Sequence, residues 1–370
     1  MKLVVTGANG FVGRHVVAAA RDRGHEVLAL VRPSSPAGPI EDAVGVSIGR
    51  IDLRGGEGLV ELLRGADGVI HLAAAKSGDF QAQFAGTVVA TERLLDAMTR
   101  AGVERLVGVS SFSVYDYRRA EGSLIDEATP IDANPAGRDE YARTKLLQET
   151  LYRDHRSAGG GDSDRTVVIV RPGMIFGPDN LWHALIGAPM GGRFLRIGRS
   201  AIVPLTHVEN VADALVLAAE LNAPGAVLQE VPDVINIVDD DLPTQDGYVS
   251  LLRRLDPTSP PTVTVPWPIA RGVAAGLAAA NRRLLGGGAK FPGIVVPDRL
   301  DARFKPFTYS NDLAKVTLGW TPRWSIAEGI ERSVAASSAS SASRGLRTPS
   351  GSAGVRCPDP DAPTDRSGRD

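Results

Sequence analysis

The stretch KLVVTGANGFVGR, residues 2–14, decides the fold of this chain. Residues 3–5 form an apolar, β-branched run that is too short for a helix and is typical of a buried strand. Gly7, Gly10 and Gly13 follow at intervals of three, where the chain must turn. In a nucleotide-binding strand–turn–helix unit such glycines permit the tight turn, the approach of a pyrophosphate and close helix packing. The stretch therefore predicts a dinucleotide site at the N-terminus of the following helix.

The composition describes a large chain without a strong net charge. It has 370 residues, 43% hydrophobic content, and 41 basic against 43 acidic residues, which predicts a sizeable core and no nucleic-acid partner. The single cysteine, Cys357, excludes a disulfide and a cysteine-based zinc site, and we expect no metal. Because neither a signal peptide nor a long uncharged apolar run is present, we expect a cytoplasmic protein with no membrane span.

Helical and strand patterns alternate beyond the glycine turn. Strands are expected over residues 25–32, 44–52, 68–74, 105–110, 166–170 and 234–238, and helices over 11–23, 59–63, about 81–100, from 141 onward and over 208–221. This alternation predicts an α/β fold, a Rossmann-type doubly wound parallel sheet with right-handed crossovers and a smaller C-terminal substrate lobe.

The domain boundaries follow from the composition. We predict a nucleotide-binding domain over residues 1–172 and 205–240, and a substrate lobe over 173–204 and 241–331. An alanine-rich tract at 269–285 is expected to be a packed lobe helix rather than a membrane contact. Residues 332–370 contain almost no large apolar side chain and are predicted to form a disordered tail.

The end of the second strand bears on the cofactor. An NAD-binding unit usually places an acidic side chain there for the ribose hydroxyls, whereas this chain has Arg32. A carboxylate repels a 2′-phosphate, and a guanidinium pairs with it. Arg32 therefore favours NADP(H), with NAD(H) and a merely solvated turn arginine as the alternatives. Asp52 and Leu53, after the third strand, are placed to touch an adenine.

Candidate catalytic residues follow the fifth strand, whose end carries Ser110, Ser111 and Ser113. About twenty-five residues later, Tyr141 and Lys145 stand one helical turn apart and face the same side of a helix. An ammonium beside a phenol lowers the pKa of that phenol, which suits a tyrosine that exchanges protons near neutral pH. An isolated Tyr-x-x-x-Lys is more often ordinary helix surface, but the glycine turn and the serine pair argue for a site.

Several motifs in this order resemble one family. They are Thr6-Gly7-x-x-Gly10-x-x-Gly13, His71-Leu-Ala-Ala, Ser110-Ser111 with Val114-Tyr115, Tyr141-x-x-x-Lys145, Arg171-Pro172 through Phe176-Gly177-Pro178, His207-Val208 through Asn210-Val211-Ala212, and Leu318-Gly-Trp-Thr-Pro322. Over residues 1–331 the sequence resembles an extended short-chain dehydrogenase/reductase, a group also called the NAD-dependent epimerase/dehydratase family.

The resemblance implies a role for each catalytic candidate. Tyr141 would be the general acid/base, Lys145 would hold the nicotinamide ribose and lower the pKa of the tyrosine, and Ser111 would bond the reacting oxygen. Ser111 is preferred to Ser110 because it lies four residues before Tyr115, the family spacing. Where many members carry Asn in an Asn-x-x-Gly-Thr setting, this sequence is interpreted as having Thr87, which would alter a proton relay there.

The same resemblance and the strand ends assign the binding candidates. The expected cofactor-binding residues are Gly7, Asn9, Gly10, Phe11, Val12, Gly13, Arg32, Asp52, Leu53, Leu72, Ala73, Ala74, Tyr141, Lys145, Pro172 and Gly173, and the substrate candidates are Lys76, Ser113, Met174 and Trp182. Nucleotide-sugar epimerases usually carry Asn where this chain has Met174, and methionine suits an apolar ligand better than a diphosphate. Arg171-Pro172-Gly173, Asn210 and the tract from Pro266 to Leu284 are more similar to the hydroxysteroid-dehydrogenase-like and dihydroflavonol-reductase-like branches.

Three functions remain open from the sequence. The first is an NADP-preferring dehydrogenase or reductase of a secondary alcohol or ketone in a fairly apolar small molecule. The second is a nucleotide-sugar epimerase or dehydratase with bound NAD, and the third is a non-catalytic NADP-sensing Rossmann protein, against which Ser111, Tyr141 and Lys145 argue. The resemblance also makes a homodimer plausible. The exact substrate, the direction of reaction and cofactor exchange are left open.

Overall fold

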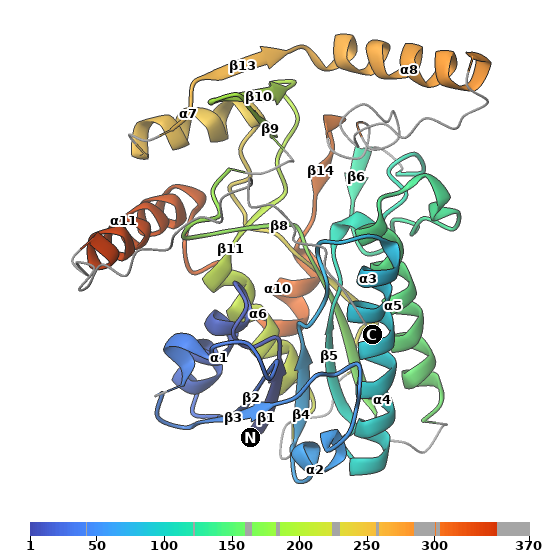
Figure 1. Cartoon of the computed structure of the whole chain (residues 1–370), viewed down its shortest axis with the longest axis vertical. Coiled ribbons are helices and arrows are strands. Elements are labelled where there is room, and N and C mark those ends of the chain that lie inside the picture. Colours follow the sequence, from blue (N-terminus) through green and yellow to red (C-terminus); the bar gives the residue numbers. More distant parts are fainter. Residues whose placement is uncertain are drawn as a thin grey trace, which may run out of the picture.

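A computed structural model of the chain describes residues 1–41, 43–120, 123–159, 165–182, 186–223, 230–256, 259–284, 300 and 304–345. Its centre is a seven-stranded sheet in the order β12-β7-β5-β4-β1-β2-β3, in which every neighbouring pair is parallel (Figure 1). The strands are β1 (Lys2–Thr6), β2 (Glu26–Val31), β3 (Val46–Arg50), β4 (Gly68–His71), β5 (Arg105–Val109), β7 (Thr166–Pro172) and β12 (Val234–Ile237).

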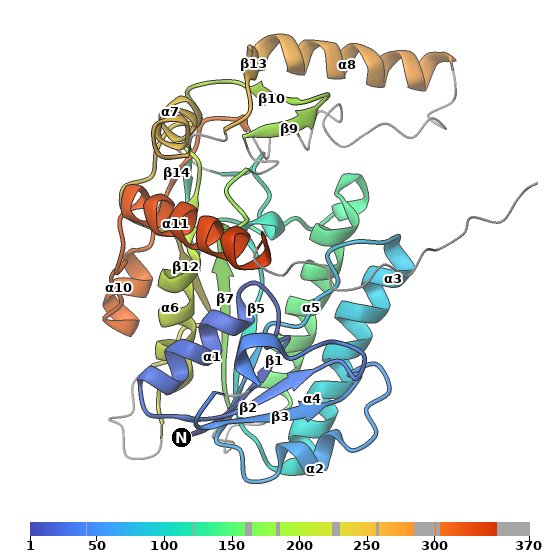
Figure 2. The same ribbon diagram turned by 60° about the vertical axis from the view of Figure 1, so that its left-hand side comes forward.

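Helices cover both faces of this sheet (Figures 1 and 2). One face packs against α1 (Gly13–Asp22), α6 (Val208–Glu220) and α10 (Asp312–Leu318), and the other against α2 (Leu59–Leu63), α4 (Ala90–Ala101) and α5 (Glu140–Ser157). Successive side chains of a strand point to opposite faces, so Leu3 and Val5 join the first core while Val4 joins the second. The predicted doubly wound sheet is confirmed.

The long helix expected over about 81–100 is built from three pieces. It begins as α3 (Phe80–Phe84), widens into one π turn, η2 (Ala85–Val89), and continues as α4. Thr87 is buried in that wide turn, where its Oγ1 accepts the N–H of Ala75 at 3.0 Å. Wide turns of this kind often accompany functional sites.

A smaller lobe stands at the carboxyl edge of the sheet (Figure 2). It contains a three-stranded sheet of β9 (Gly187–Met190), β10 (Arg193–Ile197) and β13 (Thr262–Val265), together with α7 (Gln245–Leu255) and α8 (Trp267–Leu284). Short parallel pairs, β8 (Met174–Phe176) with β11 (Leu205–His207) and β6 (Leu124–Ile125) with β14 (Thr308–Tyr309), complete the edge. Short 3₁₀ turns of the described residues include η1 (Gly38–Ile40), η3 (Phe112–Val114) and η5 (Pro135–Gly137).

Two expectations for the C-terminal half need correction. Helix α8 forms as predicted, but Ile269, Val273 and Leu277 are exposed on it, so it is not packed all round. Helix α11 (Ile326–Gly345) continues past residue 332, where a disordered tail was expected. Alanine is the best helix former, and Ile330 and Ser333 are buried on the helix face that packs into the lobe. Residues 346–370 lie outside the described residues.

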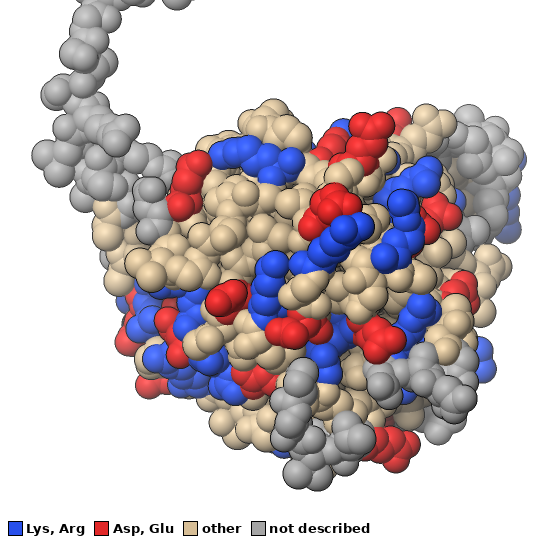
Figure 3. Space-filling view, turned by 90° about the horizontal axis from the view of Figure 1, so that it is seen from below, with Lys and Arg blue, Asp and Glu red and all other residues tan. Residues whose placement is uncertain are grey.

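The surface seen from below in Figure 3 has basic and acidic side chains interspersed, without a patch of one sign. Within the described ranges, no helix is both long enough and apolar enough to cross a bilayer. The same ranges contain no group of three or more His, Cys, Asp or Glu side chains arranged for a metal ion.

Candidate active site

The glycine turn leaves no room for side chains. Gly7 has a φ of +66°, which favours glycine, and its carbonyl accepts the N–H of Gly10 at 2.9 Å. A Cβ on Gly13 would lie 2.2 Å from the Gly7 carbonyl oxygen. Helix α1 then begins without an acidic residue in its first turn and without a side-chain cap from Val12. The backbone N–H groups of this turn fit the diphosphate of a dinucleotide.

The neighbours of the turn lock it to other strand ends. A Cβ on Gly7 would approach the Ala73 nitrogen to 3.1 Å, which brings the segment after β4 against the turn. Asn9 donates from Nδ2 to the Pro36 carbonyl at 3.0 Å, and the Phe11 ring packs against Gly177. Turn and strand ends therefore form one surface, as a cofactor site spanning these segments requires.

The predicted adenosine end of the site is rich in arginine. Arg32 is exposed after β2 and makes no hydrogen bond or ion pair through its side chain within the described part of the chain. Arg54 binds Asp52, with its Nη2 2.6 Å from Oδ2. Hydrogen bonds from Arg54, supported by the charges of Arg54 and Arg32, lower the pKa of Asp52 to about 2. Leu53 is partly buried against the core beneath.

The three catalytic candidates lie together at the end of β5 and the start of α5. Ser111 follows β5, where its Oγ accepts the N–H of Ser113 at 3.2 Å, and its hydroxyl is near enough to Tyr141 to act on the pKa of that phenol. Lys145 Nζ lies 5.9 Å from the centroid of the Tyr141 ring. Asp139 caps α5 by accepting the N–H of Ala142 at 2.9 Å, which sets where this helix begins. The structure thus brings the predicted serine, tyrosine and lysine into one place.

The expected effect of Lys145 on Tyr141 is wrong for this structure. Burial raises the pKa of Tyr141 to about 12; the nearby Ser111 hydroxyl opposes this rise and the charge of Asp139 adds to it. Lys145 Nζ instead donates to the Val109 carbonyl at 2.7 Å and to Gln148 Oε1 at 2.8 Å. Burial, with the nearby charge of Lys76, lowers the pKa of Lys145 to about 7.

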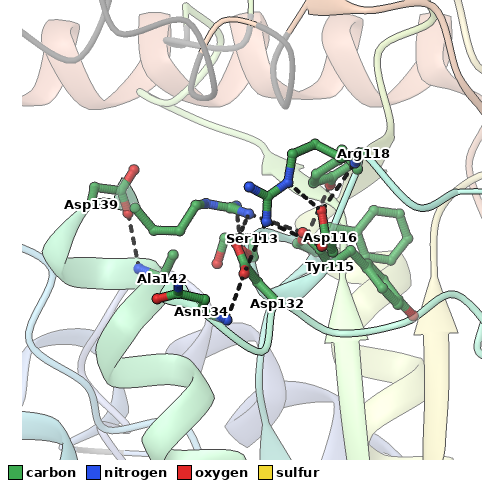
Figure 4. Close-up of polar contacts among 11 residues, drawn as sticks. Ser113, Tyr115, Asp116, Arg118, Asp132, Asn134, Asp139 and Ala142 are labelled. Carbon is green, nitrogen blue, oxygen red and sulfur yellow. Dashed lines mark hydrogen bonds and ion pairs between the residues drawn. The ribbon is translucent and has the colours of Figure 1, made fainter. Parts of the chain in front are cut away.

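An arginine–carboxylate cluster, missed at the sequence level, supports this site (Figure 4). Arg138 donates to the carbonyls of Ser113 at 2.6 Å and Tyr115 at 3.0 Å, and pairs with Asp132 at 3.3 Å. Because Arg138 stands directly before the Asp139 cap, it ties the serine-bearing loop to the start of α5. The only sequence signal was a charged run just ahead of Tyr141.

Two of the four substrate candidates lie in the core of the lobe, and the other two, Ser113 and Lys76, lie near strand ends of the central sheet. Met174, 7% exposed, and Trp182 pack in the core of the lobe, where the Trp182 ring lies 4.9 Å from that of Phe194. Ser113 Oγ and Trp182 Nε1 are buried polar atoms that lack a hydrogen-bond partner among the described residues. Lys76 lies on the surface beyond β4, and the surrounding protein lowers its pKa by displacing water.

The remaining cofactor candidates are half-buried or packed backbone positions. Leu72 and Ala73 donate their N–H groups to Thr6 Oγ1, each at 3.1 Å. Ala74 is half-buried, Pro172 ends β7, and a Cβ on Gly173 would lie 2.3 Å from the Pro204 carbonyl oxygen.

The interpretation of Thr87 is also corrected. The spacing Gln83-x-x-Gly86-Thr87 aligns Gln83 with the Asn of the family motif and Thr87 with its Thr. Gln83 is buried and donates to the Gly78 carbonyl at 3.0 Å, whereas Thr87 holds the N–H of Ala75. The departure from the family is therefore one extra methylene at residue 83, not a lost amide at residue 87.

Comparison with known proteins agrees with this geometry. The sequence model of the NAD dependent epimerase/dehydratase family matches residues 3–237. The 3beta-hydroxysteroid-dehydrogenase/decarboxylase isoform 1 of Arabidopsis thaliana is 29% identical over 352 residues, which cover 90% of this chain and 78% of that protein. A 4-hydroxy-2-methyl-3-oxo-4-farnesyl-3,4-dihydroquinoline-1-oxide ketoreductase of Stigmatella aurantiaca is 30% identical over 343 residues, covering 90% and 95%. The structure of MoeE5 with UDP-glucuronic acid and NAD is similar at a TM-score of 0.66 and 25% identity, covering 92% and 100%.

Proposed function

This chain belongs to the NAD dependent epimerase/dehydratase family, and from that premise we propose that it is an NADP(H)-preferring oxidoreductase acting on a secondary alcohol or ketone of a fairly apolar small molecule. The observation that carries the proposal is the placement of three side chains at one strand end: Ser111 follows β5, and Tyr141 and Lys145 stand one turn apart on α5 with Lys145 Nζ 5.9 Å from the Tyr141 ring centroid. Tyr141 can donate a proton, Ser111 can hydrogen-bond the reacting oxygen, and Lys145 can carry a positive charge. Carbonyl reduction uses these three groups.

The residues divide the chemistry as follows. When bound, a nicotinamide supplies or accepts the hydride. Ser111 holds the reacting oxygen, and Tyr141 gives its phenolic proton to that oxygen in reduction or takes the proton back in oxidation. Burial raises the pKa of Tyr141 to about 12, so at neutral pH the phenol carries the proton that reduction requires. Lys145 is proposed to hold the nicotinamide ribose beside Tyr141.

The cofactor preference rests on Arg32. Its guanidinium stands beyond β2 with no carboxylate bound to it among the described residues, whereas Arg54 is already paired with Asp52. A 2′-phosphate would provide Arg32 with a charge-assisted partner. Asp52 and Leu53 are proposed to border the adenine, and Lys76 and Ser113 to face the substrate.

The substrate class rests on relatives, two of which are named for a hydroxysteroid and a farnesylated quinoline. Met174, packed in the lobe core, provides no polar group where nucleotide-sugar epimerases carry Asn. The second candidate is a nucleotide-sugar epimerase with bound NAD, which the likeness to MoeE5 with UDP-glucuronic acid and NAD favours. A non-catalytic NADP sensor is the third, and the catalytic trio argues against it. The homodimer and the cytoplasmic location stay predictions.

A variant pair tests the proposal. Wild-type protein, Tyr141→Phe and Tyr309→Phe are assayed with NADP(H) and NAD(H) on a 3β-hydroxysteroid, a 2-alkyl-3-oxoalkanoate and UDP-glucose. We expect Tyr141→Phe to lose at least about 100-fold in turnover while it still binds NADPH, and Tyr309→Phe to keep its activity. Full turnover by Tyr141→Phe would refute the assignment. Conversion of UDP-glucose with retained NAD, and of neither other compound, would make the epimerase the better description.

A further inference from the structure

We propose that Gln148 is the positioning residue for Lys145 and that a buried hydrogen-bond network anchored at Thr6 fixes its orientation. The inference rests on the proposed function, in which Lys145 serves the cofactor and Tyr141. Gln148 is 1% exposed and stands three residues after Lys145 on α5. Its Oε1 accepts from Lys145 Nζ at 2.8 Å, and its Nε2 donates to Thr91 Oγ1 at 2.8 Å. One amide thus joins the lysine to the neighbouring helix.

The direction of every bond in the network can be worked out from its β1 end. Thr6 Oγ1 accepts the N–H groups of Leu72 and Ala73, which occupy both of its lone pairs. Its own hydrogen must therefore go to His71 Nδ1, 2.7 Å away. His71 is then a neutral ring with its hydrogen on Nε2, and burial together with the charge of Lys145 lowers its pKa to about 3. The low pKa agrees with a neutral ring, and the bond from Thr6 fixes which nitrogen carries the hydrogen.

Donors and acceptors around Thr91 likewise determine the orientation of the Gln148 side-chain amide. His71 Nε2 lies 2.9 Å from Thr91 Oγ1 and donates to it, and Thr91 in turn donates to the Thr87 carbonyl at 2.6 Å. The second lone pair of Thr91 can only receive the Gln148 Nε2–H group, so Oε1 must point at Lys145. The reverse orientation of the amide would set its NH₂ group against the ammonium.

This arrangement holds Lys145 in position and does not provide a continuous path for proton transfer. The chain from Thr6 through His71 and the chain from Gln148 both donate into Thr91, so the bond directions converge there and do not run through. Two hydrogens of the ammonium are held, by Val109 and by Gln148. The third hydrogen is left for the nicotinamide ribose, in a direction set by the other two.

Substitution of Gln148 separates positioning from general structure. Gln148→Leu removes the acceptor and so disfavours the charged lysine, whereas Gln148→Glu puts a carboxylate in its place and favours it. The two variants should move the alkaline limb of the pH–kcat/KM profile in opposite directions, by about one pH unit each. Gln81→Leu makes the same change at an exposed position on α3 and should leave the profile unchanged.

A binding measurement reports on the same feature without turnover. At pH 8, Gln148→Leu should weaken NADH about tenfold and leave ADP, which lacks the nicotinamide riboside, unaffected. Gln148→Glu should restore most of the NADH affinity.

The inference and the proposed function would fail in different measurements. Wild-type pH limbs and NADH affinity in a folded Gln148→Leu protein would overturn the inference, and so would shifts of both variants in the same direction. If Gln148→Leu does not fold, the inference is tested by Gln148→Glu alone, in which the alkaline limb of the pH–kcat/KM profile should move to higher pH. Failure of the proposed function alone would be seen as full turnover by Tyr141→Phe, while Gln148→Leu still binds NADH about tenfold more weakly than wild type.

Discussion

Arg171 and Glu149 form a bidentate ion pair between β7 and α5, with Nε–Oε1 and Nη2–Oε2 distances of 2.8 and 2.6 Å. Both side chains are buried, at 2% and 0% exposure. Arg153 adds a second partner for the carboxylate at 2.7 Å, and the Arg171 guanidinium lies 4.7 Å from the centroid of the Tyr115 ring. The pair therefore holds the helix that carries Tyr141 and Lys145 against the sheet.

Removing Glu149 should destabilise the protein more than removing Arg171. Glu149→Gln leaves the Arg171 charge buried without a carboxylate, and we expect a loss of about 3–5 kcal/mol in the free energy of unfolding. Arg171→Met should cost less, because Glu149 keeps its bond to Arg153. Urea unfolding measures both. Equal losses, or a larger loss for Arg171→Met, would contradict this account.

Alanine substitutions should rank the glycines by available space. In Gly13→Ala the new Cβ would lie 2.2 Å from the Gly7 carbonyl oxygen, so the turn must shift, and we expect NADPH binding to be lost. Gly272→Ala on α8 meets no atom within 4 Å and should stabilise the helix by up to about 1 kcal/mol. Calorimetric titration with NADPH and thermal unfolding are the measurements. Normal NADPH binding by Gly13→Ala would refute the site at this turn.

Arg32→Ala should reduce the preference for the phosphorylated cofactor. If the guanidinium pairs with the 2′-phosphate, its removal should weaken NADPH about tenfold, equivalent to about 1.4 kcal/mol, and leave NADH nearly unchanged. Arg14→Ala, a partly exposed arginine on α1, is the control. The dissociation constants of wild-type protein, Arg32→Ala and Arg14→Ala for NADPH and NADH are compared side by side. Equal weakening of NADPH and NADH would leave Arg32 without a role in cofactor choice.

NADH binding should take up a proton above pH 7. The pKa of Lys145 is about 7, so this lysine is mostly neutral at pH 8, and ribose hydroxyls together with a diphosphate favour its charged form. The affinity for NADH should therefore fall as the pH rises above 7. Calorimetry in buffers of different ionisation enthalpy counts the protons. Lys145→Met should abolish the uptake, and unchanged uptake in that variant would assign the proton to another group.

The sheet could be predicted because its elements are local patterns. Short apolar runs such as residues 3–5 and the glycine turn identify strands and their ends without reference to distant residues. The sequence predicts the bounds of the lobe but does not locate its strands, because β9 contains glycine and proline and β10 pairs with a strand far along the chain, Phe194 opposite Thr262. Composition also misled at α11, where serine and alanine resemble a linker until Ile330 supplies a buried face.

The meeting of Ser111, Tyr141 and Lys145 at one strand end could be predicted, but not how these residues are held. Tyr141 and Lys145 share a helix face by spacing alone. Gln148 resembles any polar helix residue in the sequence, because its partners come from other elements and are selected only when the layers pack. The pKa of Tyr141 likewise depends on burial, which the sequence does not contain.

The wide turn at residues 85–89 accommodates one residue more than an α-helix would. Each residue of an α-helix advances the helix by about 100° around its axis, so the extra residue offsets the side chains before the turn from those after it. Gln83 is buried on the segment before the turn, and Leu94 and Met98 face the sheet on the segment after it. Deleting one residue there would return the helix to a regular phase and force it to give up either its contact with the site or its place in the core.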